Sequence, residues 1–170
     1  MTETLSQYNI GDWVLHHFYG VGQIKKVEEK PIHGKTVKCF RVKTKDGAFW
    51  FPKNQPDNPR IRPVATPKTI QRAIQELRKP VRNLNPDRKI WKKRIDEVKS
   101  SDDLTVISQT IRDLTVLKTL RKSNQTEDKA LNHFSERLIS EWAATMKLDV
   151  GTIRRQLNGY LQTIRTRASV

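Results

Sequence analysis

The residues that most often carry acid–base or metal chemistry are few and scattered in this sequence. Its four histidines are His16, His17, His33 and His133. His16 and His17 are neighbours in a predicted strand, where neighbouring side chains point to opposite faces, so they cannot line one site. His33 lies in a predicted turn and His133 on a predicted helix, each without a second ligand at metal-binding spacing. We expect neither a metal site nor a catalytic histidine.

The nucleophiles and carboxylates give no stronger sign of catalysis. The single cysteine, Cys39, falls in a predicted strand with no disulfide partner, so core packing is its expected role. Paired acids such as Glu28-Glu29 and Asp102-Asp103 are sequence neighbours, and helix capping suffices for Asp102. We therefore expect a binding protein rather than an enzyme, with no cofactor and no small-molecule substrate.

The charge of the chain indicates its partner. Thirty-three Lys and Arg against 18 Asp and Glu give a net charge of +15, and residues 67–94 contain ten of these basic residues against two acids. Such a block favours a polyanion partner, although a solvated basic face is the simpler alternative. Large apolar residues are too sparse along it for a membrane-surface helix.

The chain shows neither an apolar run of membrane-spanning length nor a charged-then-apolar leader, so we expect a cytoplasmic protein.

The first third of the chain has the two-residue period of β-strands. Residues 1–9 are polar and expected to be loose. Gly20 and Gly22 then interrupt a run of strand residues and predict a tight β-corner. A phosphate-binding loop would need a third glycine and a following helix. Asp46-Gly47 predicts a hairpin. Short strands are expected at 13–18, 21–29, 36–44, 48–51 and 60–62, which indicates a small curved barrel.

The period changes to 3.6 near residues 63–67, which predicts a domain boundary there and helices beyond it. The first two helices are expected to begin at Thr66-Pro67 and Asn85-Pro86, since proline suits the first helical position. Ser101 or Asp102 is expected to cap the third helix. The fourth and fifth are expected to begin near Thr126 and Thr152. The predicted class is α+β: a small five-stranded β-barrel over residues 10–64, followed by a bundle of about five helices over 66–170.

Several short segments resemble one known family in their order and spacing. They are Gly11-Asp12, Val14 to His16, Gly20-Val21-Gly22, Ile24 to Glu28, Gly34, Phe51-Pro52 with Ile61-Arg62, Ser100-Ser101-Asp102 and Ile111 to Leu114. The series is similar to the RNA-polymerase-interacting domain shared by the CarD family of bacterial transcription regulators and the transcription-repair coupling factor. It covers roughly residues 10–145, and its second half favours the CarD family.

This resemblance implies a Tudor-like barrel that docks on the β-subunit lobe of RNA polymerase by adding to a sheet edge. By position, the lobe-contacting residues fall at Lys30, Ile32 and Trp50. Trp50 also alternates with Phe49 and Phe51, so its indole points outward if the phenylalanines point inward. The alternative is a buried Trp50 with Phe49 outside.

The resemblance further implies that the helical half lies against promoter DNA, with basic residues on phosphates and a tryptophan wedged into the minor groove. If Ser100-Ser101-Asp102 sets the alignment with the family, the position of the wedge tryptophan falls on Asp87. Phosphate would repel the negative charge of this residue. Trp91 falls where the family has a core aromatic, and its spacing to Ile95 and Val98 puts it on their apolar helix face, which favours core packing. A wedge role for Trp91 is the alternative. The candidate DNA-binding residues are Arg82, Arg88, Lys89, Trp91, Lys92, Lys93 and Arg94.

Together these observations predict a non-catalytic, nucleoid-associated transcription regulator. It would bind the RNA polymerase β subunit and contact promoter DNA largely independently of sequence, thereby modulating the stability of the open complex. The alternatives are an architectural or RNA-binding protein that acts without polymerase, and a Tudor-like protein-interaction module unconnected with transcription.

Overall fold

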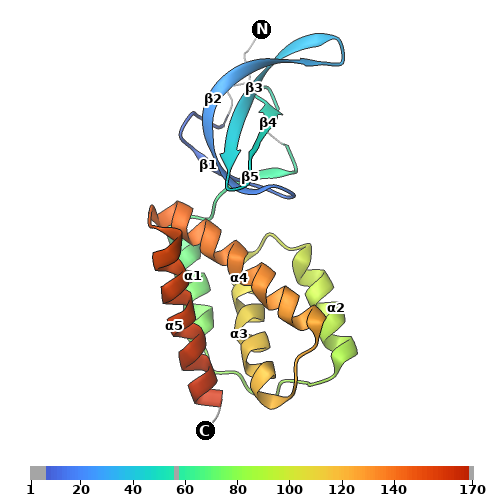
Figure 1. Ribbon diagram of the computed structural model, residues 1–170, viewed down its shortest axis with the longest axis vertical. Helices are drawn as coiled ribbons and strands as arrows, with labels where there is room; N and C mark the ends of the chain where they lie inside the picture. The colour runs from blue at the N-terminus through green and yellow to red at the C-terminus, as the bar shows by residue number, and fades with distance from the viewer. Residues whose placement is uncertain (1–6, 56–57, 169–170) are drawn as a thin grey trace. The chain divides into compact units, whose positions relative to one another are not determined.

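The computed structural model describes residues 7–55 and 58–168, which fall into two compact units, Met1–Val64 and Ala65–Val170 (Figure 1). The first unit is an antiparallel sheet with the strand order β4-β3-β2-β1-β5. The strands are β1 (Trp13–His16), β2 (Gly20–Ile32), β3 (Lys35–Thr44), β4 (Ala48–Pro52) and β5 (Ile61–Pro63). Five strands followed by helices confirm the α+β class.

The two glycines of the predicted β-corner have different roles. Gly20 has a φ of +78°, a left-handed conformation that L side chains rarely adopt. Gly22 lies against β3, since an added Cβ would come within 2.5 Å of Val42 Cγ1 and 2.9 Å of the Lys43 carbonyl oxygen. The sharp turn and the close strand approach therefore both require glycine.

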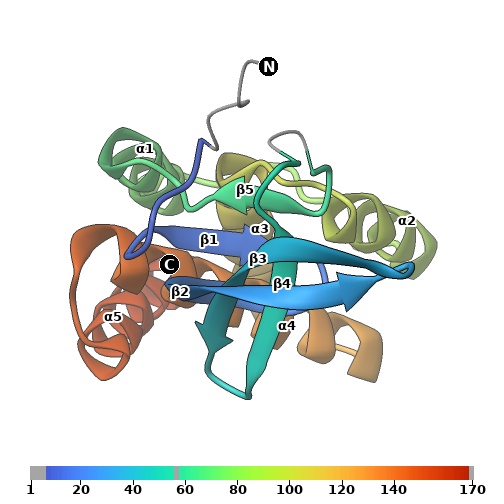
Figure 2. The ribbon, with the colours of Figure 1, turned by 90° about the horizontal axis from the view of Figure 1, so that it is seen from above.

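The sheet is open, so the small curved barrel expected from the strand pattern is not closed. Among the described residues β4 pairs only with β3 and β5 only with β1, which leaves both as edge strands (Figure 2). Pro52 and Pro63 end these two short strands, and proline has no N–H to continue a ladder. The sheet still curves around one apolar core.

The core of the sheet unit follows the alternation of its strands. Phe49 and Phe51 on β4 are buried with Phe40 and Val42 on β3. Tyr8 joins them at 4% exposure, its ring 5.6 Å from that of Phe51 in an edge-on contact. Tyr8 belongs to the stretch 1–9 that the sequence predicts to be loose, and residues 1–6 of that stretch lie outside the described part of the chain.

The second unit contains α1 (Pro67–Arg78), α2 (Arg88–Lys99), α3 (Leu104–Leu120), α4 (Gln125–Met146) and α5 (Val150–Ala168). Helix α3 contacts each of the other four helices (Figure 1). It is buried along most of its length and carries Ile107, Ile111, Leu114 and Leu117 into the core. None of the described helices is both long and apolar enough to span a membrane.

Three helices begin at capping residues other than those predicted. Asp87 Oδ1 accepts from the N–H of Lys89 at 2.8 Å, so the N-cap of α2 lies two residues beyond Asn85. The Asn85 side chain instead accepts from the Asp87 N–H, which forms a turn just before the helix. Asp103 caps α3 and Asn124 caps α4 in the same way. The cap of α1, Thr66, is as predicted.

Candidate functional site

The outward face of the sheet presents Trp50. Phe49 and Phe51 are buried while Trp50 is 41% exposed, so the indole points away from the core. Lys30 Nζ lies 4.3 Å from the centroid of the Trp50 ring, and the indole Nε1 donates to Glu28 Oε2 at 2.9 Å. Ile32, half-buried at the end of β2, shares a face of the strand with Glu28 and Lys30 because residues two apart point the same way. We call these four residues the Trp50 surface.

Glu28 fixes this arrangement through its charge. Lys26 Nζ lies 2.6 Å from its Oε1, and Lys30 Nζ lies 3.6 Å from its Oε2. The hydrogen bond from Lys26, together with that from Trp50, lowers the pKa of Glu28 to about 2. The carboxylate therefore stays ionised at neutral pH and holds the indole beside the Lys30 ammonium group. Such an exposed, oriented tryptophan beside a cation is suited to anchor a protein partner.

Of the four residues of the Trp50 surface, Lys30, Ile32 and Trp50 were expected from the resemblance, and Glu28 was not. Two signals could have found it. Glu28 precedes Lys30 by two residues on the same strand, and the Asp46-Gly47 hairpin brings β4 to the far side of β3 from β2. A carboxylate on the outward face of β2 then lies within reach of a long side chain on β4.

Five of the basic residues around α2 are exposed, and Arg94 is not. Arg82, Lys89, Lys92 and Lys93 are exposed, and none forms an ion pair with another described residue. Arg88 is exposed but donates to the Lys122 carbonyl at 3.0 Å and lies 3.8 Å from Glu127. These five residues, which we call the α2 surface, present cations to solvent.

Arg94 differs from its neighbours. Its Nη2 donates to Asp113 Oδ2 at 2.7 Å, and its guanidinium carbon lies 4.8 Å from the centroid of the Trp91 ring. Asp113 is buried and also accepts from Arg112 Nε. Arg94 is therefore engaged within the bundle, unlike Lys92 and Lys93, which precede it.

Trp91 lies in the core of the helical unit. It is 2% exposed, packs with Ile95 and Val98, and its Nε1 donates to the Asn85 carbonyl at 2.7 Å. The Trp91 ring is thus not on the surface that DNA could reach, which corrects its inclusion among the DNA contacts. Asp87, where the resemblance led us to expect the wedge position, is the N-cap of α2.

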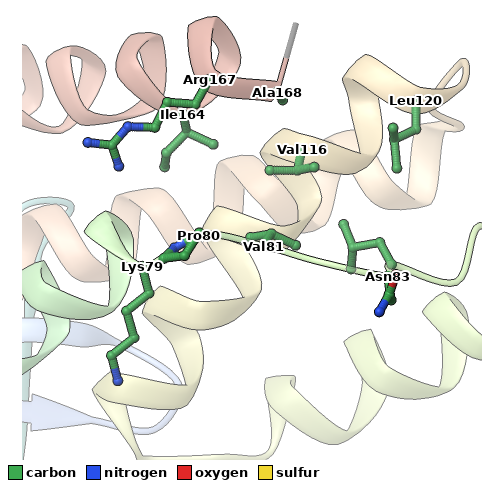
Figure 3. Close-up of a pocket in the computed structure, with 10 residues that line it drawn as sticks. Lys79, Pro80, Val81, Asn83, Val116, Leu120, Ile164, Arg167 and Ala168 are labelled. Carbon is green, nitrogen blue, oxygen red and sulfur yellow. The ribbon is translucent and has the colours of Figure 1, made fainter. Parts of the chain in front are cut away.

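Two hollows mark the helical unit. One, of about 200 Å³, is lined in part by Arg88, Lys89 and Lys92. The other, of about 320 Å³, lies between the α1–α2 connection and the ends of α3 and α5, with Val116 and Ile164 in its wall and Lys79 and Arg167 at its rim (Figure 3). Neither hollow brings a histidine or cysteine to its lining.

The candidate catalytic groups occupy structural positions. His16 is buried and His17 exposed, so the two point to opposite faces as predicted. Burial lowers the pKa of His16 and, at buried Cys39, raises the pKa of the thiol. Over residues 7–55 and 58–168, no three His, Cys, Asp or Glu side chains gather as metal ligands would.

The first unit is an open sheet that presents an oriented tryptophan and two cations, and a basic helical bundle follows it in the chain. Such an arrangement is typical of a binding module. Residues 8–65 match the family model of the CarD-like/TRCF RID domain. The first unit is therefore a domain of that type, whose family is generally non-catalytic, and the match supports a CarD-like, RNA-polymerase-interacting role for this unit. The match ends at residue 65 and does not include the helices. No curated protein matches the chain.

Proposed function

We propose that this protein is a non-catalytic, CarD-like transcription regulator that binds the β-subunit lobe of RNA polymerase through the Trp50 surface and promoter DNA through the α2 surface. The observation that carries the proposal is the exposed Trp50, held by Glu28 beside Lys30 within a polymerase-interacting type of domain. A surface tryptophan that a partner buries, with a cation over its ring, is a typical energetic centre of a protein interface.

Binding to DNA would be electrostatic and sequence-independent. The exposed cations of the α2 surface suit phosphate contacts, which position a protein on a duplex without distinguishing its bases. A protein that holds polymerase and upstream DNA together more tightly in the open than in the closed promoter complex shifts that equilibrium toward open. A coupling of about 1–3 kcal/mol would change the ratio about fivefold to 150-fold.

The decisive experiment is a pull-down of purified bacterial RNA polymerase, and of its isolated β lobe, by wild-type protein and two variants. Salt of about 0.2 M suppresses sequence-blind electrostatic binding. Trp50→Ala should abolish capture of both targets. The matched control is Phe18→Ala, which removes another exposed aromatic of the same unit and should leave capture intact.

Two results would contradict the proposal. If wild-type protein captures neither target while binding naked nucleic acid at lower salt, it acts without polymerase. If Trp50→Ala and Phe18→Ala bind polymerase equally well, the Trp50 surface is not the contact.

A further inference from the structure

A second exposed aromatic feature lies in the loop between β1 and β2. The side chains of Phe18 and Tyr19 are 71% and 62% exposed, compared with 41% for Trp50 and 37% for Trp13. Together with His17 they form what we call the aromatic loop, His17–Tyr19. Solvating two adjacent large rings is unfavourable, and the polymerase proposal above gives them no role.

The aromatic loop is held in place by buried neighbours. His16 Nδ1 accepts hydrogen bonds from the N–H groups of Phe18 and Tyr19, at 3.0 and 3.2 Å. One face of the Tyr19 ring stacks on buried Phe49, with centroids 5.3 Å apart and planes inclined by 20°. The backbone and one ring are therefore ordered before any partner arrives, which reduces the entropy lost on binding.

A cation accompanies the two rings. The Arg60 guanidinium carbon lies 5.9 Å from the centroid of Phe18, and the Arg60 carbonyl accepts from the N–H of His17 at 2.8 Å. Within the described part of the chain the Arg60 side chain forms no ion pair, so its charge is available to an anion. Residues 1–64 contain eleven Lys or Arg and six Asp or Glu, so the whole unit favours a negatively charged partner.

We propose that the aromatic loop and Arg60 form a site for unpaired nucleic acid, in which bases stack on Phe18 and Tyr19 and a backbone phosphate contacts Arg60. Flat rings beside an unpaired guanidinium match the alternation of bases and phosphates along a single strand. A duplex hides its base faces, so it could use only the cation. This site shares no residue with the Trp50 and α2 surfaces and does not depend on the function proposed for them.

The test measures fluorescence anisotropy of a labelled twelve-nucleotide oligothymidine and of a duplex at about 0.2 M salt. A background with Lys89→Glu and Lys92→Glu reverses two of the five cations of the α2 surface and should weaken any binding there. Phe18→Ala should weaken binding of the single strand about fivefold or more, since stacking on one ring contributes at least that much. Tyr19→Ala and Arg60→Gln should weaken it as well, and none should change duplex binding as strongly.

A photochemical measurement locates the contact directly. An oligonucleotide with 5-iodouracil in place of thymine cross-links to a stacked aromatic side chain on irradiation, and we expect the adduct at Phe18 or Tyr19. Trp50→Ala is the matched control and should leave both cross-linking and affinity unchanged. Because Phe18 contacts little of the core, circular dichroism of Phe18→Ala should match that of the wild type.

Three outcomes would overturn the proposal: oligothymidine affinity that Phe18→Ala leaves unchanged, adducts confined to the helical unit, or no binding of the single strand at all. Loss of polymerase capture by Phe18→Ala, with oligothymidine binding intact, would instead make the aromatic loop a protein contact. This result can be told apart from failure of the proposed polymerase contact. In that case it is Trp50→Ala that has no effect on polymerase capture.

Discussion

The indole N–H of Trp50 donates a 2.9 Å hydrogen bond to the carboxylate of Glu28, two strands away across the sheet. Hydrogen bonds from Lys26 and Trp50 lower the pKa of Glu28 from its ordinary 4.5 to about 2. A carboxylate with a depressed pKa keeps its favourable interactions above its ordinary pKa and loses them as pH falls through the lowered value. The orientation of Trp50 should therefore persist well into the acidic range.

This relationship predicts the pH response of one NMR signal. The indole N–H resonance of Trp50 should stay constant from pH 7 to about 4.5 and move only as the pH falls toward about 2. Glu28→Gln should remove that transition and shift the resonance already at pH 7. A midpoint near the ordinary value of 4.5 would mean that the Lys26 and Trp50 contacts do not hold in solution.

Trp91 should be important for stability. Truncation of a buried aromatic costs about 3–5 kcal/mol, so Trp91→Ala should lower the free energy of unfolding by that amount in urea denaturation. The neighbouring exposed Ile90 supplies the matched control, since Ile90→Ala should change stability by about 0.5 kcal/mol or less. A normal midpoint for Trp91→Ala would argue against the core position.

The sequence was most informative where its period was clear. Alternation around Phe49 and Phe51 predicted correctly that Trp50 points outward, and the spacing of Trp91, Ile95 and Val98 favoured the core position that Trp91 occupies. Both inferences need only the local geometry of a strand or a helix, which sequence spacing encodes directly.

Features that depend on distant pairing were not predictable. Arg94 belongs to the same basic run as Lys92 and Lys93, and only its contact with Asp113, nineteen residues away, distinguishes it. A barrel closes only if its two edge strands, here β4 and β5, pair with each other. The number of strands in the sequence does not determine whether they do. The α2 start was misplaced because Asn85-Pro86 and Asp87 are both good caps, and the turn at Asn85 decides between them.

Asp87 allows capping and charge to be separated. Asp87→Ala removes the hydrogen bond to the Lys89 N–H and should cost about 0.5–2 kcal/mol of stability. Asp87→Asn keeps an equivalent cap but removes the negative charge, so the unfolding midpoint should change little. If DNA lies along the α2 surface, both variants should bind a duplex more tightly than the wild type. Unchanged affinity of Asp87→Asn would indicate that the phosphates are distant from Asp87.

Lys92 and Arg94 should respond differently in DNA binding, although both belong to one basic run. Lys92 is exposed, so if it contacts a phosphate, Lys92→Ala should reduce the slope of log affinity against log salt by about 0.9. Arg94 is occupied by Asp113 and Trp91, so Arg94→Ala should leave that slope unchanged while lowering the unfolding midpoint.

Duplex titrations at several salt concentrations, paired with thermal unfolding of each variant, measure both effects. Net charge falls by one in either variant, so a general loss of positive charge would change the two slopes equally. Different slopes therefore require that the individual side chains, rather than the overall charge of the bundle, meet the phosphates. Equal slopes would show that Lys92 does not contact the phosphates. A reduced slope for Arg94→Ala alone would show that Arg94 leaves Asp113 to bind DNA.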